Sequence, residues 1–325
     1  MRFLISLVVI LIGFNSFSQV LPNLGGQRAG VSTLSFLKND IAPRSAAMGG
    51  ASVALPGFAQ SLFTNPAGIA EVKNMSFGVN QYWHGAGMNQ TGVFAVLPRK
   101  NQVSSLGFFM EVRTEFQPQG TGQQVFATNT AFGLSYGLQL TEWFTLGVTG
   151  RFVYEQLAEY NNSTATVDLG FRYQTDWKDM AFAVMVQNFG GNSGLGGDYL
   201  AEGFNRNQAE LDDYTTPTVF KLGLSMLALD REKQKIRVAF ELNHPNDNAE
   251  NFRFGAEYSF IDLLFVRAGF KVNVQGQRLP VGGLGLRSRI GAHPFYIDYT
   301  ALPTDFYGLQ HNISLVFELN KDSRE

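Results

Sequence analysis

The chain contains no cysteine, which excludes a disulfide framework, a thiolate metal site and a cysteine nucleophile. Charged residues are only 16% of the 325 residues, and a net charge of -2 offers no basic surface for nucleic acid. After the N-terminus, no window holds the ~18 uncharged apolar residues that a membrane helix needs. The four histidines are scattered, and no serine occupies a nucleophile elbow. We therefore expect no metal site, no cofactor and no enzymatic activity.

The first eighteen residues have the pattern of a secretory signal peptide. Arg2 supplies the positive charge, residues 3–14 form a short apolar core, and Ser16-Phe17-Ser18 is a small-x-small cleavage site. We expect cleavage near Ser18/Gln19, because the apolar run is too short for the alternative, an uncleaved anchor helix. Export of a chain without a membrane helix, followed by membrane strands, indicates the outer membrane of a Gram-negative cell.

Residues 74–325 consist largely of stretches in which apolar and polar residues alternate. A period of two places alternate residues on opposite faces of a strand. In residues 143–155, one set is Phe144, Leu146, Val148, Phe152 and Tyr154, and the other includes Thr145, Gly147, Thr149, Arg151 and Glu155. Repeated stretches of this kind are typical of a transmembrane β-barrel.

The spacing predicts an all-β fold, an antiparallel transmembrane barrel of about 14 strands. We expect strands near 74–82, 91–98, 103–114, 127–140, 142–157, 163–175, 179–188, 216–228, 235–242, 251–260, 262–273, 281–290, 294–300 and 309–319. Short connections at 99–101, 141, 176–178, 230–234, 261 and 291–293 alternate with connections that are mostly longer. Barrels of this class have short periplasmic turns and longer outer loops, so an even strand count returns both termini to the periplasm.

The two predicted faces differ in charge. The set assigned to lipid, for example Val167, Leu169 and Phe270, contains no charged residue. The opposite set holds Arg151, Glu155, Asp168, Arg172, Lys221, Arg237, Glu241, Arg253, Glu257, Arg267, Lys271, Arg287, Arg289 and Asp298. Because a cation facing mid-bilayer lipid costs roughly 2–4 kcal/mol, these charges must point inward. Both signs occur on neighbouring strands, which favours a lumen crossed by ion pairs over a charged conduit; a soluble β-sandwich is the competing architecture.

Residues 19–73 have a different composition, rich in glycine, alanine and serine. Asn65 followed by Pro66 fits a helix N-cap and the first helical position. A segment this small should lie inside or against the barrel as a plug with short helical turns. Its motif residues are Met48, Gly49, Gly50, Ala51, Asn65, Pro66, Ala67 and Gly68. We favour a packing role for them, with direct ligand contact as the alternative.

Two runs in this segment, residues 42–51 and 61–70, resemble the N-terminal signature of the PorV/PorQ family of outer-membrane proteins. That family is similar to the FadL long-chain fatty acid transporters, which share an asparagine-proline-alanine element, a plug and a fourteen-stranded barrel. Gly68 replaces the leucine that follows this element in PorQ, which favours a PorV-like protein, although the chain is short for PorV itself. The motif match covers about thirty residues, and a paralogue with another partner remains an alternative.

The resemblance implies a non-enzymatic role in type IX secretion. PorV-like proteins sit beside the translocon barrel and receive cargo through the cargo's C-terminal signal domain, so the partners would be that barrel, secreted cargo, or both, in outer-membrane lipid. We expect recognition in the long loop from Phe189 to Thr215. Its candidate binding residues are Tyr199, Phe204, Tyr214, Asp212 and Asp213, aromatic anchors with an acidic rim. A solvated loop without a partner is the alternative.

The second hypothesis is FadL-like transport or binding of hydrophobic small molecules. It requires an apolar pocket behind the plug and a weakened strand through which the ligand leaves sideways. Gly282, Gly283 and Gly285 are candidates for such weakening, although ordinary barrel curvature also explains them.

Overall fold

The computed structural model describes residues 31–99, 103–118, 124–158, 160–197, 212–277 and 279–320. The predicted signal peptide, its cleavage site and the first residues of the predicted plug lie outside this part of the chain. The same is true of Tyr199 and Phe204 in the candidate loop.

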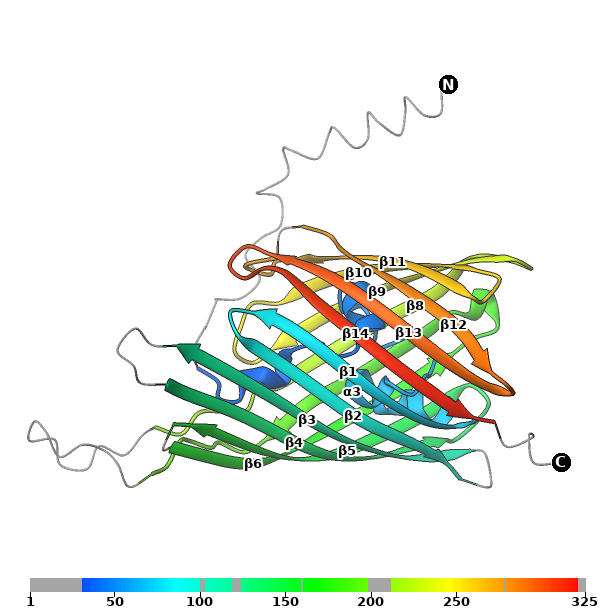
Figure 1. Ribbon diagram of the computed structural model, residues 1–325. Coiled ribbons are helices and arrows are strands. Elements are labelled where there is room, and N and C mark those ends of the chain that lie inside the picture. The colour runs from blue at the N-terminus through cyan, green and yellow to red at the C-terminus, as the bar shows by residue number, and fades with distance from the viewer. Residues whose placement is uncertain are drawn as a thin grey trace, which may run out of the picture.

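Fourteen strands run through the described residues and close into a barrel in which each strand pairs with its sequence neighbours and β1 pairs with β14 (Figure 1). All neighbouring pairs are antiparallel. The strands are β1 Met75–Gly85, β2 Met88–Pro98, β3 Ser104–Pro118, β4 Gln124–Gln139, β5 Phe144–Leu157, β6 Tyr160–Gln174, β7 Ala181–Gly190, β8 Val219–Arg231, β9 Gln234–Pro245, β10 Asn251–Phe260, β11 Leu264–Val272, β12 Val281–Ile290, β13 His293–Thr304 and β14 Gly308–Leu319. The predicted fourteen-stranded antiparallel barrel is confirmed.

The predicted loop at 83–90 is wrong. β1 continues to Gly85 and β2 already begins at Met88, so only Ala86 and Gly87 connect them. Gly85, Ala86 and Gly87 have left-handed φ values of 83°, 49° and 79°, which suit the tight turn of a hairpin. The polar residues of the predicted loop therefore pair as strand. His84, expected in a surface loop, is instead buried.

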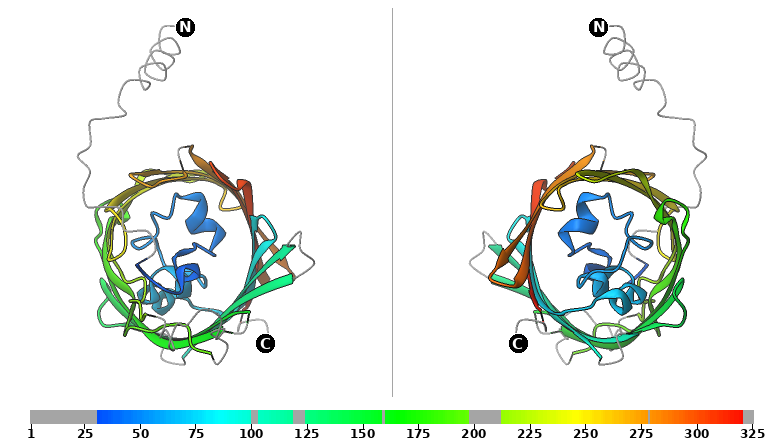
Figure 2. Two further views of the ribbon diagram at one scale, coloured as in Figure 1. Left: turned by 90° about the vertical axis from the view of Figure 1, so that its left-hand side faces the viewer. Right: turned by 90° about the vertical axis from the view of Figure 1, so that its right-hand side faces the viewer.

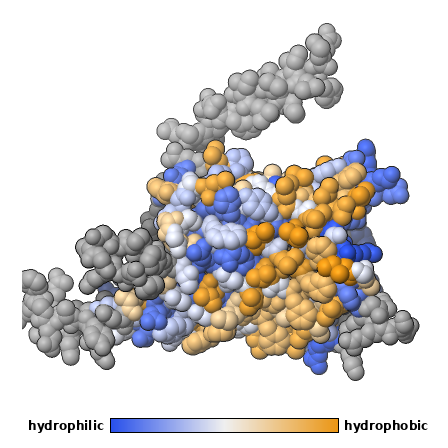
Figure 3. Space-filling model, viewed as in Figure 1, coloured by the Kyte–Doolittle hydropathy of each residue, from blue (hydrophilic) through white to orange (hydrophobic). Residues whose placement is uncertain are grey.

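The two faces of the barrel wall follow the predicted alternation. Leu169 on β6 is 51% exposed and points outward, whereas its neighbour Asp168 is 1% exposed and points into the barrel. Large apolar residues cover much of the outer wall in the face that Figure 3 shows. Of the charged inward set, Arg151, Arg172, Glu241 and Arg267 are all buried. Only a surface of this kind can face hydrocarbon without desolvating charge.

Among the described residues, no helix has the length and apolar character to span a bilayer.

Substituting Leu169→Arg should destabilise the folded barrel by roughly 2–4 kcal/mol, because the cation then faces lipid well inside the strand. Ile290→Arg is the matched control, since Ile290 is also outward-facing but ends β12, where the cost falls to about 0–1 kcal/mol. Urea unfolding in lipid vesicles measures both. Equal losses for the two variants would contradict the assigned faces.

The segment from Val31 to Asn74 lies inside the barrel (Figure 2). It contains four short helices, η2 Ser35–Lys38, α2 Pro43–Ala47, α3 Ser61–Thr64 and η3 Pro66–Glu71. We call this segment the plug. The chain then enters β1 at the rim where β14 ends, which we call the C-terminal rim. The plug thus joins the wall covalently at one rim.

The plug begins at the other rim. Ser32 forms a bridge with Thr215, which precedes β8, and Thr33 donates a 3.4 Å hydrogen bond to Glu155 near the end of β5. The described chain therefore crosses the lumen from the opposite rim to the C-terminal rim. The predicted periplasmic position of both termini concerns residues outside the described part and stays a prediction.

An apolar core lies between the plug and the wall. It comprises Ile41, Ala59, Leu62, Phe63, Ile69 and Val72 of the plug and Phe94, Val96, Phe109 and Val316 of the wall. Phe63 packs edge-on against Phe94, with ring centroids 5.5 Å apart. Burial of these side chains holds the plug in place, at roughly 1.5–3 kcal/mol for each large side chain.

Candidate functional site

Inward-facing glycines on four neighbouring strands form a glycine seat, a patch of wall without side chains, against which the second plug motif, residues 65–68, packs. These glycines are Gly107, Gly137, Gly147 and Gly170 on β3 to β6. A Cβ atom on Gly147 would lie 2.1 Å from the backbone nitrogen of Ala67, and one on Gly170 would lie 2.2 Å from Asn65 Oδ1. No side chain fits there, so the plug backbone packs directly against the wall.

A second glycine seat on β10 and β11 contacts the first plug motif, residues 48–51. A Cβ atom on Gly269 would lie 2.0 Å from the backbone nitrogen of Gly49, and one on Gly255 would lie 2.6 Å from the carbonyl oxygen of Met48. Gly49 and Gly50 have φ values of 67° and 78°, which favour glycine. The Ala51 N–H donates a 3.2 Å hydrogen bond to Met48 O and closes the turn.

The predicted helical turn at Asn65 and Pro66 is confirmed as the 3-10 helix η3. Asn65 Oδ1 accepts a 3.1 Å hydrogen bond from the Ala67 N–H, and Pro66 occupies the first helical position. Asn65 Nδ2 donates to Val53 O at 2.8 Å, and the Gly68 N–H donates to Asn65 O at 3.0 Å. The asparagine therefore caps the helix and ties it to a preceding plug turn.

The inward-facing charges fall into four separate clusters. In the first, Arg151 Nη2 lies 3.0 Å from Asp168 Oδ2. The Asn188 N–H donates to the other carboxylate oxygen of Asp168 at 2.6 Å, at a bulge where Asn188 has a φ of 57°. The Arg151 guanidinium also lies over the ring of Phe109, 5.2 Å from its centroid. Both charges of the pair are compensated within the wall.

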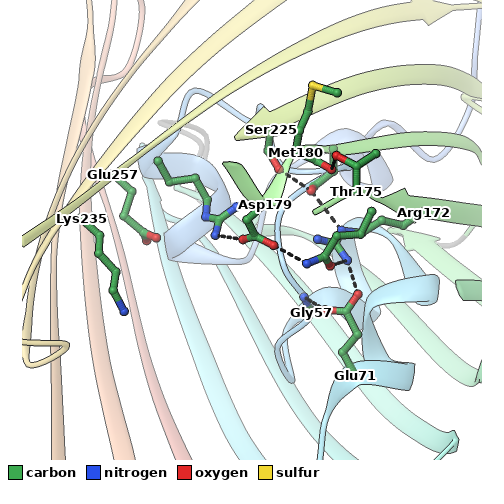
Figure 4. Close-up of polar contacts among 12 residues, drawn as sticks. Gly57, Glu71, Arg172, Thr175, Asp179, Met180, Ser225, Lys235 and Glu257 are labelled. Atoms are coloured by element: carbon green, nitrogen blue, oxygen red, sulfur yellow. Dashed lines mark hydrogen bonds and ion pairs between the residues drawn. The ribbon is translucent and has the colours of Figure 1, made fainter. Parts of the chain in front are cut away.

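The second cluster lies toward the C-terminal rim and joins the plug to the turn between β6 and β7 (Figure 4). Arg172 forms an ion pair with Glu71 of η3, and Arg237 forms one with Asp179. Gln174 lies between them, accepting from Arg172 at 2.9 Å and donating to Asp179. The sequence analysis missed the acidic partners in this cluster. Glu71 lies in the plug, and Asp179, the first residue of the strand predicted over 179–188, lies instead in the turn before β7.

The third cluster surrounds Glu257. Arg44 of α2 donates two hydrogen bonds to this carboxylate, at 2.8 and 2.9 Å. Arg267 donates to Glu257 at 2.6 Å and to Asp298 at 2.5 Å. This arrangement of two guanidinium groups and two carboxylates is buried and neutral overall, and it anchors α2 to β10, β11 and β13.

The fourth cluster surrounds Glu241, which is fully buried. Its carboxylate accepts hydrogen bonds at 2.8 Å from the N–H groups of Ser52 and Val53 in the plug. Arg253 lies 3.8 Å away and Lys221 lies 4.0 Å away. Most of the predicted set of lumen charges is thus divided among four sites. Four members of the set lie outside these clusters. Glu155 contacts the Thr33 hydroxyl, Arg287 lies over the Tyr296 ring, Lys271 lines a cavity and Arg289 is exposed.

The described part of the candidate binding loop lies at the opposite rim. Asp212, Asp213 and Tyr214 are exposed, and Tyr214 is held by two 2.9 Å backbone hydrogen bonds with Ser193. This bridge fixes one edge of the loop next to the mouth of the barrel.

Several cavities lie between the plug and the wall, and two of them differ clearly in lining. The C-terminal cavity, near the C-terminal rim, has a volume of about 320 Å³. Its apolar lining includes Phe58, Val72, Phe265, Leu286, Tyr296 and Val316. The opposite-rim cavity has a volume of about 230 Å³ and a polar lining that includes Asp40, Lys221, Arg253 and Lys271. The described residues contain no group of three side chains able to hold a metal ion.

Solved structures of other proteins share the architecture of this barrel. The P. putida toluene transporter TodX superposes with a TM-score of 0.57 at 11% identity, covering 85% of this chain and 97% of that chain. The Ralstonia pickettii toluene transporter TbuX gives 0.54 at 12% identity over 85% and 97%, and a Pseudomonas aeruginosa FadL homologue gives 0.52 at 10% over 85% and 96%. The chain has a FadL-like fold. No protein-family profile matches this FadL-like barrel, and no curated protein sequence does.

Proposed function

We propose that this FadL-like outer-membrane barrel binds small hydrophobic molecules and passes them across the membrane, with the C-terminal cavity as the binding site. The observation that carries the proposal is a cavity between plug and wall, lined in part by large apolar side chains, in a barrel whose fold matches toluene transporters. The charged residues that also line the cavity balance one another, four cations against four anions: Arg44, Lys73, Arg267, Arg287, Glu71, Asp262, Asp298 and Glu318. Arg44, Arg267 and Asp298 belong to the neutral Glu257 cluster, and Glu71 and Asp262 form ion pairs with Arg172 and Lys235.

The cavity lies beside the shortest described seam of the barrel. β11 and β12 share six paired positions, from Leu264 with Leu286 to Gly269 with Val281. Phe265 and Leu286, both from this seam, line the cavity. Gly283 and Gly285 follow on β12, where the absence of side chains removes cross-strand packing. We therefore place the sideways exit of a hydrophobic ligand at the β11–β12 seam.

Binding of toluene and of a long-chain fatty acid to the purified full chain in detergent tests the proposal. Phe58→Ser removes a ring from the cavity lining and should weaken binding by about tenfold, the equivalent of about 1.4 kcal/mol of lost apolar contact. Phe306→Ser is the control, because Phe306 is 81% exposed in the β13–β14 turn. Failure of the unmodified protein to bind either probe would refute the proposal.

A second candidate is the PorV-like role in type IX secretion, in which the barrel binds the translocon or the signal domain of secreted cargo. It is supported by the motif resemblance and by the exposed Asp212, Asp213 and Tyr214, which are fixed at the opposite rim by the Ser193 bridge. Copurification from outer membranes, followed by identification of associated proteins, distinguishes the two candidates. A large barrel or secreted cargo in the sample favours secretion, and lipid alone favours transport.

A further inference from the structure

The opposite-rim cavity holds three cations whose charge the surrounding protein does not fully neutralise. Arg253 and Lys271 occupy directly paired positions on β10 and β11, and like charges at such positions repel each other. Lys221 lines the same cavity from β8 and is 8% exposed. A barrel wall that places three cations together needs an anion close to them.

The two carboxylates beside these cations are already engaged. Glu241 accepts from the Ser52 and Val53 N–H groups and from Asn243 Nδ2, all at 2.8 Å. This leaves Lys221 at 4.0 Å, beyond hydrogen-bonding distance. Asp40 accepts from the Ser45 hydroxyl and forms no ion pair with a described residue. Neither carboxylate therefore supplies a direct acceptor to the lysines.

The lysine ammonium groups have no such acceptor elsewhere in the described part of the chain. Lys271 makes no hydrogen bond to a described residue, and the only ion-pair partner of Lys221 there is Glu241. Lys221 is 8% exposed and Lys271 is half-buried. An ammonium group largely withdrawn from bulk water without a hydrogen-bond acceptor is costly, so an oxygen ligand in the cavity would stabilise it.

We propose that the opposite-rim cavity binds a small hydrophilic monocarboxylate, whose oxygens contact Lys221, Arg253 and Lys271. Three cations against Glu241 and Asp40 leave a surplus of one positive charge, which a monoanion neutralises and a dianion exceeds. The other ion pair at this cavity, Lys38 with Asp247 at 2.7 Å, is already neutral. This site is separate from the proposed hydrophobic site and does not depend on it.

Calorimetric titration of the purified full chain with lactate tests the site, with propane-1,2-diol as the neutral analogue and inorganic phosphate as the competing anion. We expect lactate to bind, the diol to bind at least about tenfold more weakly, and phosphate to bind no tighter than lactate. Lys271→Met should weaken lactate binding by about tenfold or more, and Lys271→Arg should retain it.

Lys235→Met is the matched control, since Lys235 pairs with Asp262 on the exposed surface. The proposal is overturned if the unmodified protein binds no lactate, if the diol binds as well as lactate, if phosphate binds tighter, or if Lys271→Met leaves the affinity unchanged. Should Lys271→Met fail to fold, the ligand series on the unmodified protein and on Lys271→Arg still decides. Phe58→Ser should leave lactate binding intact, which separates this test from that of the hydrophobic site.

Discussion

Replacing Gly147 with leucine should push the plug off the barrel wall and destabilise the protein by on the order of 3 kcal/mol. A Cβ atom at this position would lie 2.1 Å from backbone atoms of both Pro66 and Ala67. No rotation of a side chain relieves a contact with backbone, so the plug or β5 must move. Urea unfolding gives the lost stability, and trypsin cleavage after Arg44, which lies inside the barrel, reports displacement of the plug.

Gly150→Leu is the matched control on the same strand. Gly150 points outward, and a Cβ atom added there would have no other atom within 4 Å, so the leucine side chain meets lipid. Stability and trypsin resistance should remain close to those of the unmodified protein. If both glycine variants behaved alike, direct packing of the plug backbone on the wall would not be what holds it.

Substituting Arg267→Met should cost about 3–5 kcal/mol, because it leaves Asp298 buried without its cation and removes one of the two cations of Glu257. Methionine retains much of the volume of the arginine side chain, so the lost unfolding free energy reports removal of the charge and not creation of a cavity. Urea unfolding of vesicle-reconstituted protein measures it. The plug should also loosen, since Glu257 is where Arg44 attaches α2 to the wall.

Lys235→Met breaks an ion pair of the same type on the surface, where Lys235 and Asp262 are 3.2 Å apart and both well exposed. Pairs of this kind contribute about 0–1 kcal/mol. A loss for Arg267→Met no greater than that for Lys235→Met would show that the Glu257 cluster does not stabilise the barrel.

The barrel was predictable because a membrane imposes a strict rule on each strand separately. Leu169 beside Asp168 indicates which face of β6 meets lipid without reference to any other strand. Val266 beside Arg267 does the same for β11. The alternation of apolar and polar residues therefore predicts the number of strands and the face of each that meets lipid. The hairpin at Ala86 was missed because Gly85, Gly87, Asn89 and Gln90 beside it interrupt the alternation of apolar and polar residues.

The pairing of the charges could not be predicted in the same way. Which acid meets Arg172 or Arg237 depends on strand stagger and on the path of the plug, and Glu71 and Asp179 lie in neither strand. The glycine seats left a usable signal, since Gly137, Gly147 and Gly170 occupy inward positions on successive strands. Recognising them as a seat requires the register, which places them side by side across β4, β5 and β6.

The passage of the plug through the lumen dictates an order of assembly. Its backbone touches β4 and β5 on one side and β10 and β11 on the other, and its last residue leads directly into β1. A finished cylinder would have to be threaded by a chain that is already part of its own first strand. Wrapping of the sheet around the N-terminal segment avoids this threading, and pairing of β1 with β14 then encloses the segment.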